Sequence, residues 1–199
     1  MYHYANLRAC SREGCRKAAL HDAEVCAEHL DDPRAYRERL AEMVSRGELL
    51  RGANLEGAAL AGVNLAGAKL TGANLEGANL EGANLDGADL YRALLTGANL
   101  RGAGLRGARC EQGVFGGATL DDAVCDDADF KRANFVGARA VKASFQRCAF
   151  YYSRPGSANF SAANLSGANI QRAIFRAADL RGADMTGTVG SANFDRAKR

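Results

Sequence analysis

A five-residue period constrains the fold of this chain more than any other feature of its sequence. From Leu55 to Met185 every fifth residue is Leu, Phe, Ile or Met, and the residue two places earlier is nearly always Ala. The positions that depart from the large apolar residue are Cys110, Cys125, Ala140 and Pro155. A fixed period indicates stacked repeats. Because five matches neither the 3.6 of a helix nor the 2 of a strand, each unit must turn the chain.

Units such as 53–57, with Asn or Asp often between the two apolar positions, resemble the A(N/D)LXX motif of the pentapeptide-repeat family over about residues 49–194. The resemblance implies an all-β fold, a right-handed quadrilateral parallel β-helix of about seven coils with four pentapeptides per coil. Packing agrees with it, since one large and one small apolar residue per unit fit a narrow interior without overpacking. Binding chemistry on such a rod can only lie on its outside, at its ends or at its interruptions.

The first fifty residues lack the repeat, so we predict three parts. Residues 1–48 form a small zinc-binding segment with a capping helix, residues 49–195 form the β-helix, and residues 196–199 form a basic tail. The chain has no long apolar run and its first residues lack the apolar core of a signal peptide, so we expect no membrane span and a cytoplasmic location. In that compartment the six cysteines should be thiols. We interpret Cys110, Cys125 and Cys148, at inward positions, as buried apolar filler.

The N-terminal segment carries a candidate structural zinc site. Its ligands are spaced Cys10-x4-Cys15-x10-Cys26-x2-His29, and thiolate and imidazole groups suit a closed tetrahedral zinc site without an open position for water. The spacing resembles the short Cys-Cys-Cys-His knuckles of bacterial and phage proteins. His21 is an alternative ligand, and three incidental thiols with a surface histidine are the plainer interpretation.

A helix should follow the zinc segment and cover the first coil. Asp31-Asp32-Pro33 predicts its start, an apolar stripe continues over about 13 residues, and Gly47 ends it. Such a cap would shield the unpaired strand edges of the first coil. A zinc finger that binds nucleic acid is the rival interpretation. Charge argues against it, because residues 1–48 hold eight Lys or Arg and nine Asp or Glu, whereas a nucleic-acid footprint should be basic.

Two features on the rod are candidate contact surfaces. Positions 20 apart share a face of a four-sided rod, and one face gathers a set of cations against Asp89, Glu111 and Asp129. Its cations are Arg51, Lys69, Arg92, Arg109, Lys131, Arg132 and Arg172. The second feature is the Tyr151–Ser157 irregularity, where Pro155 falls on an inward position and cannot donate a ladder hydrogen bond. There Tyr151, Tyr152 and Arg154 have the composition of interface hot spots, although a local Pro-Gly bulge explains them equally well.

No catalytic constellation is visible in the sequence: no histidine follows His29, and there is no phosphate-binding glycine motif and no paired nucleophile and base. We therefore predict that the chain is not an enzyme. The leading hypothesis is a rigid, non-catalytic interaction protein with a protein partner.

Two further functions stay open. Some members of the resembled family bind DNA gyrase as mimics of duplex DNA. That role needs an acidic rod, yet the repeat region here holds 18 Lys or Arg and 14 Asp or Glu. Nucleic-acid binding through the basic face ranks last, because the stripe is weak and lacks interleaved aromatic residues. A homodimer could form through the last coil, where Ala192-Asn193-Phe194 repeats the motif one residue early and no capping helix follows.

Overall fold

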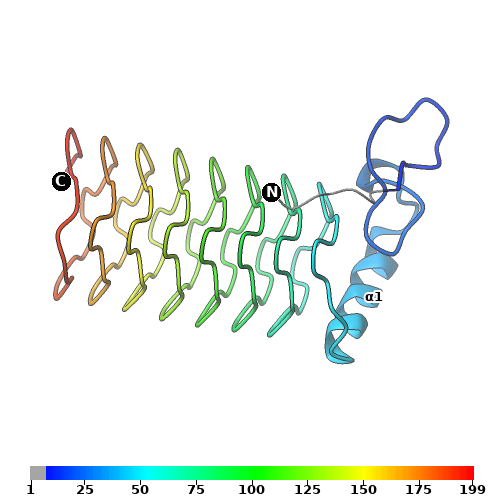
Figure 1. The fold of residues 1–199 in the computed structure, drawn as a ribbon, viewed down its shortest axis with the longest axis horizontal. Helices are drawn as coiled ribbons and strands as arrows, with labels where there is room; N and C mark the ends of the chain where they lie inside the picture. The colour runs from blue at the N-terminus through cyan, green and yellow to red at the C-terminus, as the bar shows by residue number, and fades with distance from the viewer. Residues whose placement is uncertain (1–7) are drawn as a thin grey trace.

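The computed structural model describes residues 8–199 and shows a rod of stacked coils with a small cap at its N-terminal end (Figure 1). Within these residues the helices are a 3-10 turn, η1 (Ala27–His29), and an α-helix, α1 (Pro33–Ser45). Neither of them is long and apolar enough to cross a membrane. Everything from Leu49 onward consists of coils, so the chain has one extended body and one appendage.

Each coil of the rod contains 20 residues. Parallel bridges join Leu49 to Lys69, Asn54 to Asn74 and so on along the rod, always across the same separation until the last coil. Four pentapeptides therefore complete one coil, as the resemblance to the pentapeptide repeats implied. Only one residue per pentapeptide pairs in this way, because the chain turns after every inward residue. Each side of a coil therefore contains one isolated β-bridge and no longer strand.

The turn at each corner requires a left-handed backbone. In every full unit the second residue after the inward position has a positive φ, for example 64° at Gly57 and 57° at Arg132. Glycine adopts this conformation without steric cost, whereas other residues lose about 1–2 kcal/mol. All corners from Gly52 to Gly87 are glycine, and side chains occupy many of the corners from Arg92 onward. The C-terminal part of the rod is therefore the part that carries projecting corner side chains.

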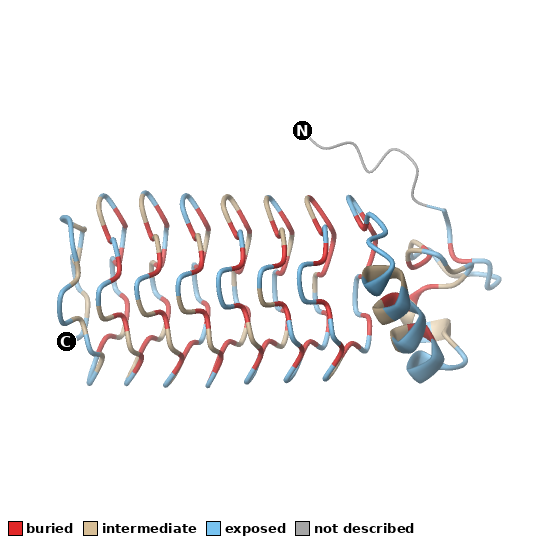
Figure 2. Cartoon of the chain, turned by 90° about the horizontal axis from the view of Figure 1, so that it is seen from below, coloured by how far each residue is buried: buried red, intermediate tan, exposed pale blue. Residues whose placement is uncertain are grey.

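The interior changes from leucine to phenylalanine along the rod, and the burial pattern is continuous through it (Figure 2). From Leu50 to Leu105 every large inward residue is leucine, and all are buried. Beyond them a chain of phenylalanine rings begins, with Phe115 stacked on Phe135 at 4.9 Å between centroids. The small inward residues Cys110, Cys125 and Ala140 lie in the coils where these larger rings begin, so the interior volume is conserved.

The three cysteines of the rod are fully buried, as the sequence analysis expected. Burial raises the pKa of Cys110 and Cys125 well above the usual range of a thiol, and raises that of Cys148 to about 12. The Cys148 thiol donates a hydrogen bond to the carbonyl oxygen of Cys125 at 2.9 Å. These thiols act as apolar filler and not as reactive groups.

The Tyr151–Ser157 segment keeps the register of the rod. Pro155 is buried at its inward position, and the bridge that would join Arg154 to Ile174 is missing because proline has no N–H to donate. The neighbouring pairs on either side are intact, from Ala149 to Asn169 and from Asn159 to Asp179. One side of one coil is distorted and no residue is inserted. Among the described residues, the hydroxyl of Ser153 is the buried polar side-chain atom left without a partner.

The cap continues the hydrogen-bond pattern of the rod over its first coil. The N–H of His21 donates to the carbonyl of Asn54 at 2.7 Å, and the buried Asn54 side chain donates to the carbonyl of Ala19 at 2.8 Å. Residues 19–21 thus pair with the first coil as a preceding coil would, and they cover the edge of the first coil. The hydroxyl of Tyr36, on α1, donates a hydrogen bond to the carbonyl of His21 at 2.8 Å. Leu40 of α1 belongs to the same apolar core as the first coil, so cap and rod share one interior.

Helix α1 begins and ends as the sequence predicted. The Asp32 side chain accepts a hydrogen bond from the N–H of Ala35 at 2.9 Å, and Pro33 occupies the first helical position. After the helix, Gly47 has a φ of 73°, which turns the chain toward Leu49 and the first coil. The helix buries Tyr36 and Leu40 against the coil and exposes its charged side.

The last coil is one residue shorter than the others. Ile174 pairs with Asn193 and Asp179 with Lys198, each across 19 residues, so the parallel pairing continues almost to the last residue. The early motif seen in the sequence therefore shortens a coil and does not end the stack. Phe194 stacks on Phe175 with centroids 5.3 Å apart, and Arg199 lies 4.0 Å from the Phe194 ring centroid. Phe194 is only partly buried, unlike the inward rings before it.

A buried carboxylate joins three coils in the middle of the rod. Asp121 has a side-chain exposure of 3%, and its oxygens accept hydrogen bonds from Arg139 at 2.6 Å, Val141 N–H at 2.9 Å and Arg101 at 3.3 Å. Burial would raise the pKa of Asp121, but these hydrogen bonds outweigh it and hold that pKa below its usual range. The carboxylate therefore stabilises the fold in its charged form.

We expect Asp121→Asn to lower the free energy of unfolding by about 1–3 kcal/mol at neutral pH, because two arginines and a backbone N–H lose a charged acceptor. In the wild type this contribution is present above the unfolded-state pKa of about 3.9 and is lost as the pH falls through the lower folded-state value. Urea unfolding at several pH values measures both effects. Asp122→Asn, at the exposed neighbouring corner, is the control. Equal stability of the two variants at neutral pH would contradict the role of Asp121.

Candidate metal centre and recognition surface

The four predicted ligands of the N-terminal segment meet in one cluster. The three sulfur atoms of Cys10, Cys15 and Cys26 and a ring nitrogen of His29 all lie within 4.8 Å of one another. Cys10 Sγ is 3.3 Å and Cys26 Sγ is 3.5 Å from His29 Nδ1, and the Cys15 and Cys26 sulfurs are 3.9 Å apart. Two local elements produce this arrangement: an antiparallel bridge from Ala9 to Ala18 and the short helix η1, which places His29 one turn after Cys26.

The separations fit a tetrahedral thiolate and imidazole site. For zinc bonds of about 2.3 Å to sulfur and 2.0–2.1 Å to nitrogen, tetrahedral ligands lie about 3.8 Å apart for two sulfurs and about 3.5 Å apart for sulfur and nitrogen. Burial would raise the pKa of Cys10, but hydrogen bonds from the backbone of Cys26 and Arg12 and from His29 outweigh it and bring that pKa to about 6. The alternative ligand His21 lies outside the cluster, and its backbone pairs with the first coil.

On the rod, the structure brings most of the predicted contact residues onto one corner, which we call the Arg/Tyr corner. Five consecutive coils contribute one pair of corner residues each, stacked by backbone hydrogen bonds such as Arg132 N–H to Tyr151 carbonyl at 2.9 Å. The corner consists of Tyr91, Arg92, Glu111, Gln112, Lys131, Arg132, Tyr151, Tyr152, Gln171 and Arg172. The cations of the basic face and the two tyrosines of the irregular segment, separate features in the sequence analysis, are therefore parts of one surface.

At the N-terminal end of the corner, arginines pack on a tyrosine ring. The guanidinium carbons of Arg109 and Arg92 lie 4.4 Å and 5.1 Å from the centroid of Tyr91. Arg92 also donates a hydrogen bond to the side chain of Gln112 at 2.8 Å, and Gln112 donates to the Tyr91 hydroxyl at 3.4 Å. Arg109 in addition pairs with Asp89 at 3.4 Å. These contacts hold the side chains in place on an otherwise exposed edge.

A similar arrangement recurs three to four coils further along. Tyr151 and Tyr152 make an edge-to-face contact with centroids 4.4 Å apart, and the guanidinium carbon of Arg172 lies 5.1 Å from the Tyr152 ring. Arg172 also donates a hydrogen bond to the Tyr152 hydroxyl. Lys131 pairs with Asp129 at 2.9 Å, whereas Arg132 makes no ion pair with any residue in the range 8–199. Arg132 and Tyr152 are thus the exposed middle of the corner.

The backbone of this corner differs from that of the other three. Arg92, Gln112, Arg132, Tyr152 and Arg172 all have positive φ values between 56° and 60°, so none of these five consecutive coils has glycine at this corner. In each of the other three columns glycine returns within the same part of the rod, for example at Gly117 or Gly167. Five side chains are therefore kept where glycine would be less strained. Strain of this kind clusters at functional sites, which favours a binding role for the corner.

Charge is also concentrated here. The corner and the side that follows it, residues 91–97, 111–117, 131–137, 151–157 and 171–177, carry six cations and one acid. Their charged residues are Arg92, Lys131, Arg132, Arg154, Arg172, Arg176 and Glu111. The net charge of this strip, +5, exceeds the +3 of the whole chain, so the remaining residues are slightly acidic. Arg176 pairs with Asp195 at 3.3 Å.

Two of the predicted contact residues lie beside the corner. Arg109 belongs to the side before it and reaches the corner through Tyr91, and Arg154 lies on the side after it, next to Pro155. Sequence reasoning did not include Tyr91 or Gln112 in this surface. It also described the basic face as lacking interleaved aromatic residues, which is wrong: Tyr91, Tyr151 and Tyr152 alternate with its cations. The signal was available, because Tyr91 directly follows the inward residue Leu90 of that face and Tyr151 and Tyr152 follow Phe150.

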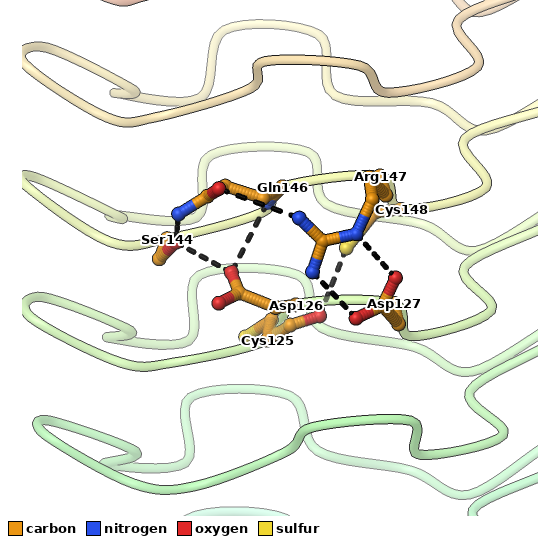
Figure 3. Close-up of polar contacts among 7 residues, drawn as sticks. All are labelled: Cys125, Asp126, Asp127, Ser144, Gln146, Arg147 and Cys148. Atoms are coloured by element: carbon orange, nitrogen blue, oxygen red, sulfur yellow. Dashed lines mark hydrogen bonds and ion pairs between the residues drawn. The ribbon is translucent and has the colours of Figure 1, made fainter.

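The acidic residues near the middle of the rod are paired between coils, as Figure 3 shows for one group. Arg147 binds both carboxylate oxygens of Asp127 at 2.7 Å, and Asp126 accepts a hydrogen bond from the N–H of Gln146 at 3.2 Å. Asp121 is likewise enclosed by Arg101 and Arg139. These acids therefore join neighbouring coils and do not form an open acidic surface.

The coils, their left-handed corners and the two-residue interior define a solenoid-type repeat protein. Two sequence models of the pentapeptide repeats match the chain, one over residues 49–87, 73–112 and 157–189 and the other over residues 95–139, together more than half of its length. The chain belongs to the pentapeptide-repeat family. No curated protein matches it significantly.

Several solved structures resemble the rod. HetL, a pentapeptide repeat protein involved in heterocyst differentiation regulation in the cyanobacterium Nostoc sp. strain PCC 7120, is 29% identical, with 75% of this chain and 81% of HetL covered and a TM-score of 0.42. A pentapeptide repeat protein of the Arabidopsis thaliana thylakoid lumen is 28% identical over 46% of this chain and 61% of that one, with a TM-score of 0.40. A trypsin-treated variant of QnrB1, a plasmid-mediated fluoroquinolone resistance protein, is 18% identical over 65% and 78%, with a TM-score of 0.39. At TM-scores below 0.5 the likeness does not extend to partners.

The left-handed corner makes a prediction about stability. Arg132→Gly should change the free energy of unfolding by less than about 1 kcal/mol, because relief of the positive φ offsets the greater freedom of glycine in the unfolded chain. Arg132→Val should lower it by about 1–2 kcal/mol, because a β-branched residue tolerates this conformation poorly. Urea unfolding of both variants checks this. A glycine variant less stable than the valine variant would show that the corner is not left-handed.

Proposed function

We propose that this protein is a non-catalytic binding protein: a rigid rod, with coils wound right-handed as the family resemblance implies, that presents the Arg/Tyr corner to a partner. The observation that carries the proposal is the column of five consecutive side chains held at positive φ, whereas each of the other three columns contains glycine over the same coils. Tyrosine and arginine are also the residues that most often dominate interface energy, and here they are pre-organised by stacking on one another. A protein is the partner that this composition first suggests.

Mimicry of duplex DNA toward DNA gyrase fits this surface poorly. A mimic must present carboxylates where the partner expects phosphates. The projecting corner is cationic, and acids such as Asp121 and Asp127 are bound to arginines of neighbouring coils. The generic binding role therefore remains the better proposal.

A comparison of two double variants tests the binding role. Arg132→Gly with Tyr152→Gly removes the middle of the corner, and Asp122→Gly with Lys142→Gly makes the same backbone change on another corner, where φ is also 58° at both positions. Tagged full-length proteins are purified from the cells of origin after nuclease treatment, and co-purifying proteins are quantified. We expect the co-purified amount of one partner to fall by at least about tenfold with the first double variant and to stay unchanged with the second. Identical partner profiles for both variants would contradict the proposal.

We also propose that zinc closes the cap. The donor set of Cys10, Cys15, Cys26 and His29 and its separations fit a structural site without an open position. The residues that the zinc site orders are the ones that cover the first coil: the loop after Cys15 leads to Ala19 and His21, which pair with Asn54. A segment of this size is too small to bury its own core, so a metal would supply part of its folding free energy.

Cys26→Ser should abolish stoichiometric zinc binding, loosen the cap and leave the β signal of the rod unchanged, because the rod has its own core. Native mass spectrometry of the untagged protein measures about one zinc per chain in the wild type if the site is real. His21→Gln, outside the cluster, is the control and should keep the metal. Unchanged zinc content in Cys26→Ser would refute the assignment. The same spectra also give the number of subunits. A purely monomeric wild type would rule out the homodimer through the last coil, around Phe194, that the sequence analysis left open.

A further inference from the structure

The Arg/Tyr corner has a chemistry that a protein partner does not require. Aromatic rings and cations share a single row: tyrosines lie in the first and fourth coils, and Arg92, Arg132 and Arg172 lie in the first, third and fifth. The second coil carries Glu111 and Gln112 instead. Coils stack about 4.8 Å apart, so these three cations recur about every 9.6 Å along the rod. A linear row of this kind can also follow one extended anionic chain.

We propose that the Arg/Tyr corner binds single-stranded nucleic acid, with its cations on the phosphates and its tyrosines on the bases. Sequence-tolerant binding of single strands depends on these two elements: positive charge that follows the backbone and aromatic rings on which bases stack. The inference rests on the same corner as the proposed binding function, but names a different class of ligand.

The arginines are positioned for phosphate. A guanidinium group that lies on a tyrosine face, as Arg109 does on Tyr91 and Arg172 does on Tyr152, has lost most of its conformational freedom before binding. Arg109 already binds Asp89 and Arg172 already binds the Tyr152 hydroxyl through one nitrogen each. The remaining N–H groups of each guanidinium are donors for a further oxygen acceptor. Arg132 lies between these two stacks, is exposed and makes no ion pair with any other residue from 8 to 199, so its charge is not already neutralised.

The tyrosines are positioned for bases. Tyr152 is 38% exposed and meets Tyr151 edge to face, which leaves part of its ring surface outward. The side of the rod next to the corner has an uncharged surface over three coils, where Leu94, Val114 and Asn134 lie in one column. In residues 93–97, 113–117 and 133–137 there is no charged side chain at all. Bases turned from the phosphate row toward this side would meet apolar and amide groups and no carboxylate.

The shape of the corner favours one strand over a duplex. It is a narrow edge with one row of cations, whereas a duplex presents two backbones across a groove of about 12 Å. The bases of a duplex are also stacked on one another and cannot stack on tyrosine. The five coils span about 19 Å at a spacing of about 4.8 Å. That length suits about four nucleotides, the lower end of the site sizes found for single-strand binders.

The experiment measures fluorescence anisotropy of a labelled oligothymidylate with the purified full-length protein at several salt concentrations. Three single variants, Arg132→Gly, Tyr152→Gly and Lys142→Gly, all replace a residue at the same left-handed corner position, so backbone effects cancel. We expect Tyr152→Gly to weaken binding about 5- to 100-fold through lost stacking. Arg132→Gly should lower the slope of log affinity against log salt by about 0.7. Lys142→Gly, which removes one charge from a different corner, should bind like the wild type.

Competition separates this ligand from other anions. Poly-L-glutamate and a hairpin duplex are added as competitors at equal charge, and the proposal expects both to compete at least about tenfold less well than unlabelled oligothymidylate. Equal competition by polyglutamate, with Tyr152→Gly unaffected, would show a general site for acidic peptides and overturn the proposal. Equal competition by the duplex, or equal losses for Arg132→Gly and Lys142→Gly, would overturn it as well. If oligothymidylate does not bind while the corner double variant still loses a protein partner, this inference fails and the proposed binding function stands.

Discussion

A coil of this rod can close only if the backbone turns through a left-handed residue after every inward side chain. That single constraint connects the features of the structure. It explains the recurring glycines, it limits each side to one bridged residue, and it sets the interior to two side chains per pentapeptide. Where glycine is replaced, as at Arg132 or Tyr152, the fold keeps the same φ and accepts the steric cost.

The interior and the outside of the rod use different interactions to hold neighbouring coils together. Inside, leucine and then phenylalanine rings stack from coil to coil, and the small residues Cys110, Cys125 and Ala140 compensate the added volume. Outside, charged residues 20 positions apart bind one another, as Arg147 and Asp127 do. Most such pairs are exposed and contribute little on their own. Asp121 is the exception, because its carboxylate is buried and accepts three hydrogen bonds.

The cap solves a problem that every open β-helix has at its first coil. Unpaired backbone groups at that edge would otherwise be available to another chain. Here residues 19–21 supply the missing partners and α1 covers the interior with Tyr36 and Leu40. The segment has little core of its own, so the cluster of Cys10, Cys15, Cys26 and His29 is placed where a metal would order it most effectively. Cap and rod share one apolar interior, and the Arg/Tyr corner lies on the rod, beyond the coils that are next to the cap.

The sequence by itself determined the coil. A five-residue period with one large and one small apolar position fixed the stacking and the inward residues. The 20-residue coil was implied by the resemblance of these units to the pentapeptide repeats. The limits of helix α1 and the ligand set of the cap could also be predicted, because capping residues and Cys and His spacing act locally. Tertiary structure alone decided what lies beside what on the outside. Tyr91, Gln112 and Arg109 come together, and Asp121 is enclosed by Arg101 and Arg139, because side chains one coil apart meet through rotamers that no linear pattern fixes. The positive φ of five projecting side chains in one column is likewise a property of the closed coil, and the proposed binding role rests on it.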